Sequence, residues 1–199
     1  MGKLNFTNAE TFILLKLKDE LPDSLTYHGI HHTLDVVDAA VEIADEEGVG
    51  GEELILLKTA ALYHDSGFTR SYQGHEEVGC AIAREFLPRF GYSEEQITMV
   101  CGMILATRIP QSPKNLLEKI LCDADLYYLG RNDFYPVGHT LFQEFLDRGV
   151  VSNEQDWNRL QIKFLESHHY FTDTAIRRRN SKKQQHLREV RALVARYAA

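Results

Sequence analysis

Helical patterns dominate this 199-residue sequence, and no run of alternating β-branched residues predicts a strand. Three residue pairs fit the capping box, in which one side chain caps a helix start and another, three residues later, bonds back to it. These pairs are Thr7 with Glu10, Ser93 with Gln96 and Ser152 with Gln155. Apolar residues at helical spacing predict further helices at 30–47, 53–66, 75–89, 114–130, 134–149 and 173–197.

Short breaks rich in Gly and Pro separate the predicted helices, at residues 21–23, 48–51, 67–74, 91 and 109–113. None of these breaks is long enough to be an interdomain linker, and no internal repeat is visible. A chain of this length can bury one sizeable core. We therefore expect one all-α domain, a helical bundle that spans residues 1–199.

The composition is ordinary for a globular protein, with 44% hydrophobic and 26% charged residues. No apolar run is long enough for a membrane span, and the N-terminal residues lack the basic-then-apolar order of an export signal. Three widely spaced cysteines in apolar segments indicate reduced core residues: Cys80, Cys101 and Cys122. We therefore expect a cytoplasmic protein with no membrane partner.

The net charge of −7 is unevenly distributed. From Thr174 to the end, eight Lys or Arg residues face one acid, Glu189, which leaves −14 for the rest of the chain. An acidic body repels nucleic acid. A solvated or internally paired terminal helix is therefore the favoured interpretation, and a nucleic-acid patch is the weaker alternative.

The doublet in "ALYHDSGF" is the strongest short signal for chemistry. His64 and Asp65 follow an apolar helix that Gly67 is expected to end. Adjacent helical residues point about 100° apart, so both can reach one ion only at a helix end or where a second helix crosses closely. The doublet therefore predicts a metal at a helix junction.

Partners for the doublet occur before and after it. His32 shares a helix face with Val36 and Ala40, which predicts that it faces the interior. Far downstream, "LCDADLYYLG" places Asp123 and Asp125 in an apolar segment. Carboxylates in such a segment need a cation, a proton or hydrogen bonds.

The order H…HD…D resembles the HD superfamily of metal-dependent phosphohydrolases, over residues 27–131. The resemblance implies an all-helical bundle and one divalent ion, held by His32, His64, Asp65 and one aspartate. The "ADxL" pattern implies Asp125 for the last ligand, with Asp123 as the alternative. Two imidazoles and two carboxylates suit Mn²⁺, Fe²⁺, Ni²⁺, Co²⁺, Zn²⁺ or Mg²⁺, so the identity of the metal stays open. The helices at about 134–199 follow this core.

The stretch "TYHGIHHTLDVV" is similar to a motif of class I cyclic-nucleotide phosphodiesterases, a branch of the same superfamily. That similarity implies that His28 is a proton donor to the leaving oxygen; the alternative is a capping or exposed histidine. Gly29 departs from the motif, and no further histidine follows the doublet closely, so cyclic-nucleotide specificity is not implied. His31 points elsewhere and is interpreted as a bystander.

His75 resembles the fourth residue of a six-residue set that binds two ions in some members of the superfamily. The fifth residue of that set is expected near Thr107, which is not a histidine. One tight ion is therefore expected, with His75 beside the substrate or at a weak second ion. A histidine that only bonds its own helical turn is the alternative.

Arginine and aromatic side chains near these motifs are further candidate site residues. Negative charge that develops on a phosphate calls for a cation. Three arginines are candidate clamps, although each could be a plain surface residue: Arg70, Arg108 and Arg131. Four aromatic side chains could stack on a base or belong to the core: Phe68, Tyr72, Tyr127 and Tyr128.

The resemblance implies a metal-dependent phosphohydrolase that acts on a nucleotide or related phosphate mono- or diester through an activated water. One alternative is a non-catalytic regulatory module that binds a metal or nucleotide. A weaker one is a di-iron oxygenase, which needs the six-residue set. The expected partner is a small phosphate ester, nucleic acid is not expected, and a homodimer is left open.

Overall fold

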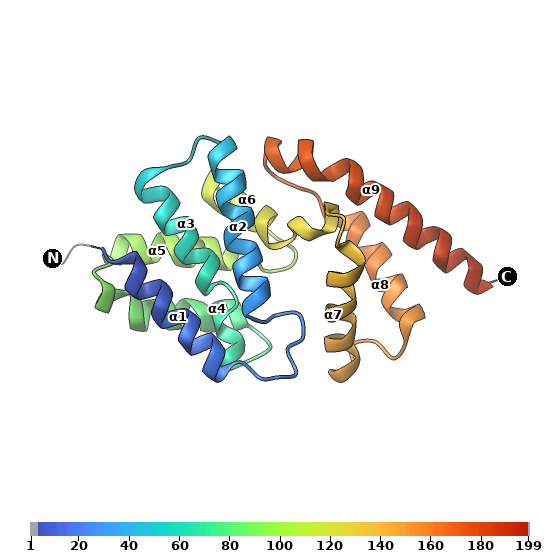
Figure 1. Ribbon diagram of the computed structural model, residues 1–199, viewed down its shortest axis with the longest axis horizontal. Coiled ribbons are helices and arrows are strands. Elements are labelled where there is room, and N and C mark those ends of the chain that lie inside the picture. Colours follow the sequence, from blue (N-terminus) through green and yellow to red (C-terminus); the bar gives the residue numbers. More distant parts are fainter. Residues whose placement is uncertain (1–3, 199) are drawn as a thin grey trace. The chain divides into compact units, whose positions relative to one another are not determined.

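The computed structural model describes residues 4–198, which form nine α-helices and no strand (Figure 1). The all-α prediction is confirmed. The helices are α1 (Phe6–Glu20), α2 (Ile30–Glu46), α3 (Gly51–Tyr63), α4 (His75–Phe86), α5 (Glu94–Ala106), α6 (Leu116–Asp125), α7 (Phe134–Asp147), α8 (Glu154–Ser167) and α9 (Asp173–Ala195). Among the described residues, none of these helices combines the length and apolar character needed to cross a bilayer. The expectation about an export signal concerns in part residues 1–3, which lie outside the described residues.

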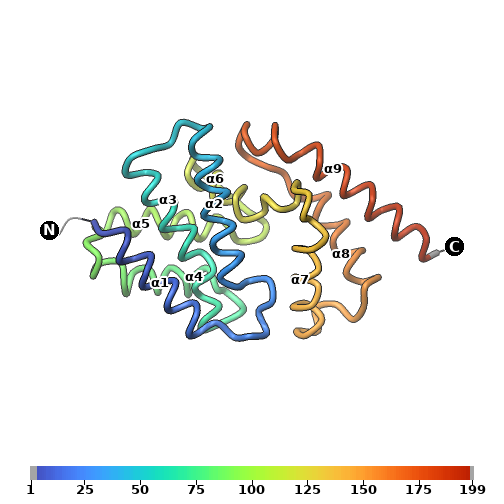
Figure 2. The backbone as a smooth tube through the Cα atoms, viewed as in Figure 1, coloured from blue at the N-terminus to red at the C-terminus, as the bar shows by residue number. Residues whose placement is uncertain are grey.

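The described chain divides into two compact units. The first comprises residues 4–22 and 28–125 and carries α1 to α6; the second comprises 23–27 and 126–198 and carries α7 to α9. The backbone tube in Figure 2 follows the chain through the helices of each unit in turn. The single-domain assignment stays a prediction.

One of the three predicted capping boxes is confirmed. Ser93 and Gln96 bond each other's backbone at the start of α5. The other two were placed wrongly: Asn5 caps α1, and Asn153 caps α8 by accepting the N–H of Asp156 at 3.0 Å. Asn is as good a cap as Ser and better than Thr, so a neighbouring Asn takes the position.

Three predicted helices run too far at their C-terminal ends. α3 ends at Tyr63, and the 3₁₀ turn η1 (Ser66–Thr69) follows the His-Asp doublet. α4 continues as the 3₁₀ turn η2 (Leu87–Phe90), and α6 gives way to η3 (Tyr127–Gly130). A 3₁₀ turn keeps apolar residues at nearly helical spacing, so the pattern alone does not reveal the change. The ends of α3 and α6 carry candidate site residues.

The core of the first unit lies where α2 packs against α3 and α6, and where α3 packs against α5 (Figure 1). Small buried residues such as Ala40 on α2 and Ala60 on α3 let the helices approach closely. The three cysteines belong to this unit and are free and buried. The prediction of reduced core thiols agrees with this placement.

The second unit has its own apolar core, to which η3 and α7 to α9 contribute side chains such as Leu129, Phe134, Leu165 and Leu187. Its basic terminal helix α9 is partly paired within the unit, because Arg191 bonds Glu166 on α8 at 2.5 Å.

Candidate metal centre

His32 lies in the first turn of α2, which begins after Gly29. It shares its helix face with Val36, Ala40 and Ile43, which are all buried, and is itself only 6% exposed. The prediction that this histidine faces the interior is confirmed. Its Nε2 therefore reaches the space that α2 shares with α3 and α6.

His64 and Asp65 stand where α3 ends. His64 keeps helical backbone angles, whereas Asp65 has φ −98° and ψ 4° and turns the chain out of the helix. Nδ1 of His64 lies 2.7 Å from the carbonyl of Ala61. A carbonyl only accepts, so Nδ1 carries the hydrogen, and the neutral ring presents its Nε2 lone pair to the opposite side. This hydrogen bond also fixes the ring's orientation, as is usual for metal-binding histidines.

Asp125 is the last residue of α6 and completes a group of three. Its Oδ1 lies 3.1 Å from Nε2 of His32 and 3.6 Å from Nε2 of His64. The two imidazole nitrogens are 3.4 Å apart. These three ligand atoms lie within 4.8 Å of one another, as the donors of one small ion would.

Asp65 stands just outside that group of three but turns one oxygen toward the same nitrogens. Its Oδ2 lies 3.1 Å from Nε2 of His64 and 3.4 Å from Nε2 of His32. This oxygen is buried and has no hydrogen-bond partner among the described residues. A buried carboxylate oxygen is costly unless a proton on a neighbouring imidazole or a cation compensates it. A cation beside it would remove that cost.

The donor set fits a divalent ion. Two imidazole nitrogens and two carboxylates form a mixed set that suits first-row transition metals and leaves positions open to other ligands. The orphaned oxygen of Asp65 and the close approach of the two Nε2 atoms are the structural observations behind this fit.

Proximity shifts the pKa values of these groups in opposite directions. Burial opposes protonation of His64, but the carboxylates of Asp65 and Asp125 outweigh it and raise the His64 pKa well above 6.5. Burial also opposes ionisation of both aspartates. The neighbouring imidazoles nevertheless lower the pKa of Asp65, and they lower that of Asp125 to about 2. A metal ion therefore competes with a proton for this cluster.

His28 and His75 lie beside the cluster, in the same unit. The ring of His28 is 5.9 Å from that of His32, centroid to centroid. His75 is the first residue of α4, and its Nε2 lies 3.6 Å from Oδ1 of Asp65. Its Nδ1 lies 3.3 Å from the carbonyl oxygen of Tyr72, three residues earlier in the chain.

The candidate arginines are engaged elsewhere. Arg70 donates to Glu85 at 3.2 Å, and both side chains are nearly half exposed. Arg131 belongs to the second unit, where its Nε donates to Asp133 at 2.9 Å. Arg108 pairs with Glu77 on the surface of α4. The role of each as a phosphate clamp stays a prediction.

Three other positions from the sequence have defined places. Asp123 is fully buried but is not a member of the group around His32. His31 is exposed on α2. Thr107 is buried at the C-terminal end of α5, and its hydroxyl donates to the carbonyl of Ile104 in the last turn of that helix. The position where the six-residue set expects a fifth ligand therefore carries an internally bonded hydroxyl.

Glu76 was missed by sequence reasoning. It is 7% exposed, and its Oε1 lies 3.7 Å from Nε2 of His75. An acid in the first turn of a helix is ordinarily explained by the helix dipole, so the sequence held no signal for a second role. The ring of Phe68 was expected only as a base-stacking or core residue; it lies on the imidazole of His75, 3.9 Å between centroids.

Comparisons with known proteins bear on the family and the fold. A protein of Clostridium beijerinckii described as uncharacterized is 32% identical over 112 residues, which cover 55% of this chain and 71% of that protein. A crystal structure of a predicted HD superfamily hydrolase from an uncultured Thermotogales bacterium has the same fold. Its TM-score is 0.63 at 23% identity, over 94% of this chain and 92% of that one. The sequence model of the HD domain matches residues 29–129. The chain therefore belongs to the HD domain family.

Proposed function

We propose that this chain hydrolyses a phosphate mono- or diester with one divalent metal ion, and that nucleotides are its leading substrate class. The single observation that supports this most is the convergence of the buried Oδ2 of Asp65 on the Nε2 atoms of His32 and His64. These three side chains and Asp125 would hold the ion. The substrate class comes from the family alone.

The bound ion would act as a Lewis acid toward a water molecule and a phosphoryl oxygen, and would lower the pKa of that water toward about 7. The protein's part is to fix the ligands before the substrate arrives. The hydrogen bond from His64 to Ala61 and the burial of His32 on α2 serve this purpose. Ligands held in place need no reorganisation at the moment of reaction.

His28 is the proposed general acid. It would hold a proton for the departing oxygen, and a positioned acid contributes typically about 10²–10⁴-fold to the rate. His75 is proposed to orient Asp65 through the 3.6 Å approach of its Nε2 to Oδ1, and to face the substrate or a weak second ion.

Arg70 is the proposed phosphate contact within the first unit, and Arg131, in the second unit, stays a predicted one. Each is now paired with a carboxylate, Glu85 or Asp133, and the pair of Arg70 is exposed. An exposed ion pair is worth only about 0–1 kcal/mol, so a phosphate dianion could displace it. A homodimer and a cytoplasmic location stay predictions.

The first test is metal content together with phosphate release. Wild type and His64→Ala would be compared by elemental analysis and by a screen of nucleotides and phosphodiesters with Mn²⁺, Ni²⁺ or Mg²⁺ added. About one ion per chain, lost in His64→Ala together with turnover, would support the proposal. Metal without turnover of any ester would instead favour the non-catalytic regulatory module. Two irons per chain would favour the oxygenase.

A further inference from the structure

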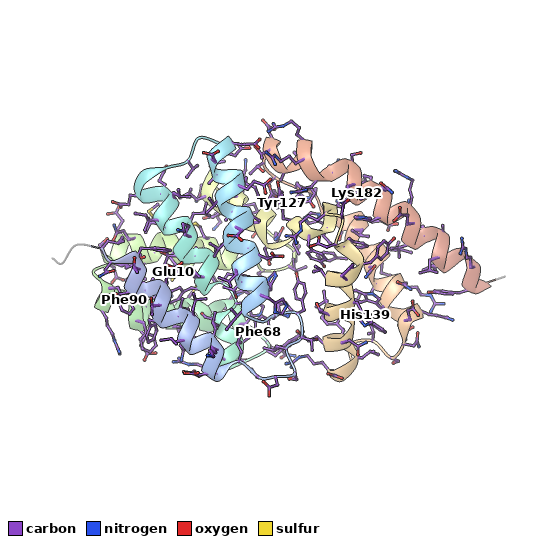
Figure 3. The ribbon with its side chains drawn as sticks, viewed as in Figure 1. Glu10, Phe68, Phe90, Tyr127, His139 and Lys182 are labelled. Atoms are coloured by element: carbon purple, nitrogen blue, oxygen red, sulfur yellow. The ribbon has the colours of Figure 1, made fainter. Side chains whose placement is uncertain are left out.

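One buried phenylalanine contacts two imidazoles beside the metal centre. The ring of Phe68, labelled in Figure 3, is 5% exposed and stacks on His75 at 3.9 Å between centroids, with the planes 17° apart. The same ring meets His28 at 4.5 Å with the planes 35° apart. The centroids of His28 and His75 are 6.5 Å apart.

Gly67, the residue before Phe68, allows a close approach to the backbone of His75. A Cβ added to Gly67 would lie only 1.9 Å from the carbonyl oxygen of His75 and 2.8 Å from its Cα. Only glycine therefore lets η1 press this closely against the first residue of α4. That approach brings the side chain of the next residue, Phe68, onto the imidazole face.

The imidazole of His75 has only long polar contacts to hold its orientation. The second side-chain torsion of histidine is broad and has no sharp staggered minimum. His75 has one long contact from Nδ1 to Tyr72, at 3.3 Å, while its Nε2 faces Asp65 and Glu76 at 3.6 and 3.7 Å. A flat ring against its face limits rotation more strictly than these contacts alone.

We propose that Phe68 is a positioning residue that holds the imidazoles of His28 and His75 in their working orientations beside Asp65. This inference rests on the proposed function, because both histidines act there. An aliphatic side chain would fill the same volume but offer no flat face. The metal ligands His32 and His64 would then be unchanged, while the two histidines that act on the substrate would lose their alignment.

The test compares steady-state phosphate release by the Mn²⁺-loaded full chain, using the best substrate of the screen. Phe68→Leu is expected to lower kcat by about 10-fold or more with KM and Mn²⁺ content unchanged, because misalignment of catalytic groups by about 1 Å can cost up to 10²-fold. Phe68→Tyr keeps the ring and is expected to retain most of kcat. Phe86→Leu is the control, since Phe86 is the last residue of α4, the helix that His75 begins, and its ring lies 4.5 Å from that of Phe12, between centroids, tilted by 34°.

A second readout does not depend on activity. The imidazole of His75 stacks on the ring of Phe68, and that of His28 lies beside the same ring, tilted by 35°. Their NMR signals are therefore expected to move in Phe68→Leu and to stay in Phe86→Leu. Signals would be assigned with His28→Gln and His75→Gln. If Phe68→Leu does not fold, Phe68→Met replaces it in both measurements.

The outcomes separate two kinds of failure. A wild type that releases phosphate from no ester, although Mn²⁺ is bound, overturns the proposed function and this inference with it. An active wild type whose kcat is unchanged in Phe68→Leu overturns only the positioning role. Imidazole signals that do not move in Phe68→Leu overturn it as well.

Discussion

Oδ2 of Asp65 lies 3.1 Å from Nε2 of His64, its neighbour in the chain, and both side chains are buried. Successive residues of an α-helix point about 100° apart, so this approach requires the helix to end between them. It does so here, because Asp65 leaves the helical backbone angles that His64 still has. The end of α3 thus delivers a nitrogen and an oxygen to one point, where α2 and α6 add His32 and Asp125.

Replacing the orphaned carboxylate should remove metal binding without unfolding the chain. Asp65→Asn keeps the shape of the side chain but removes its charge. Loss of a residue that only hydrogen-bonds a metal ligand costs up to about 100-fold in metal affinity. We therefore expect loss of the ligand itself to lower Mn²⁺ affinity by at least about 100-fold. Calorimetric titration would measure the affinity, and far-UV circular dichroism the helicity. Asp38→Asn, an exposed change on α2, is the control. Unaltered Mn²⁺ binding by Asp65→Asn would contradict the ligand assignment.

Two aspartates on one helix allow a matched test of the last ligand. Oδ1 of Asp125 lies 3.1 Å from Nε2 of His32, whereas Asp123 is not in that group. We therefore expect Asp125→Asn to lose Mn²⁺ and Asp123→Asn to keep it. Thermal unfolding of both metal-free variants would separate a lost ligand from a lost fold. The reverse pattern would make Asp123 the ligand.

The candidate metal ligands could be named from the sequence because motif order and helix faces together indicate them. His32 stands one turn before Val36 on a buried face, and an adjacent His-Asp pair converges only at a helix end. Both statements depend on local geometry alone. The contact of Phe68 with two imidazoles depends instead on how η1 packs against α4, which no local pattern encodes.

Other features of the fold could not be predicted from the sequence, for similar physical reasons. The end of α6 before η3 leaves apolar residues such as Leu126 and Leu129 at helical spacing, so the pattern continues through the break. Glu76 is explained equally well by the helix dipole and by its approach to His75. Arg70 donates to Glu85, which lies on α4, 15 residues later in the chain. Such partners are set by packing rather than by spacing.

The close approach at Gly67 predicts a large cost for a single methyl group. Gly67→Ala would place a Cβ 1.9 Å from the carbonyl oxygen of His75, so backbone must move. We expect the free energy of unfolding to fall by about 2–3 kcal/mol, toward the upper end for overpacking. Gly138→Ala is the control: it lies inside α7, where the new Cβ meets only side-chain atoms, of Gln161 at 3.4 Å and of Trp157 at 3.9 Å.

Inside a helix, Gly costs roughly 0.5–1 kcal/mol relative to Ala, so Gly138→Ala should be neutral or stabilising. Urea unfolding of both variants would measure the difference. A Gly67→Ala protein as stable as the wild type would show that η1 and α4 can separate freely.

The metal-free protein should be most stable in mildly acidic solution. His64 has its pKa raised well above 6.5, because neighbouring carboxylates outweigh burial; its contribution is therefore complete below pH 6.5 and is lost as pH rises through the raised pKa. Asp125 has its pKa lowered from 3.8 to about 2, where imidazole hydrogen bonds outweigh burial. Its contribution is present above pH 3.8 and is lost as pH falls toward 2.

Urea unfolding in excess chelator, between about pH 5 and 9, would measure this dependence. We expect the free energy of unfolding to fall on the alkaline side, and Mn²⁺ to abolish that fall because the ion takes the place of the proton at Nε2 of His64. His64→Gln should remove the alkaline fall in the absence of metal. A metal-free wild type whose stability rises steadily through neutral pH would mean that His64 is not held protonated by Asp65 and Asp125.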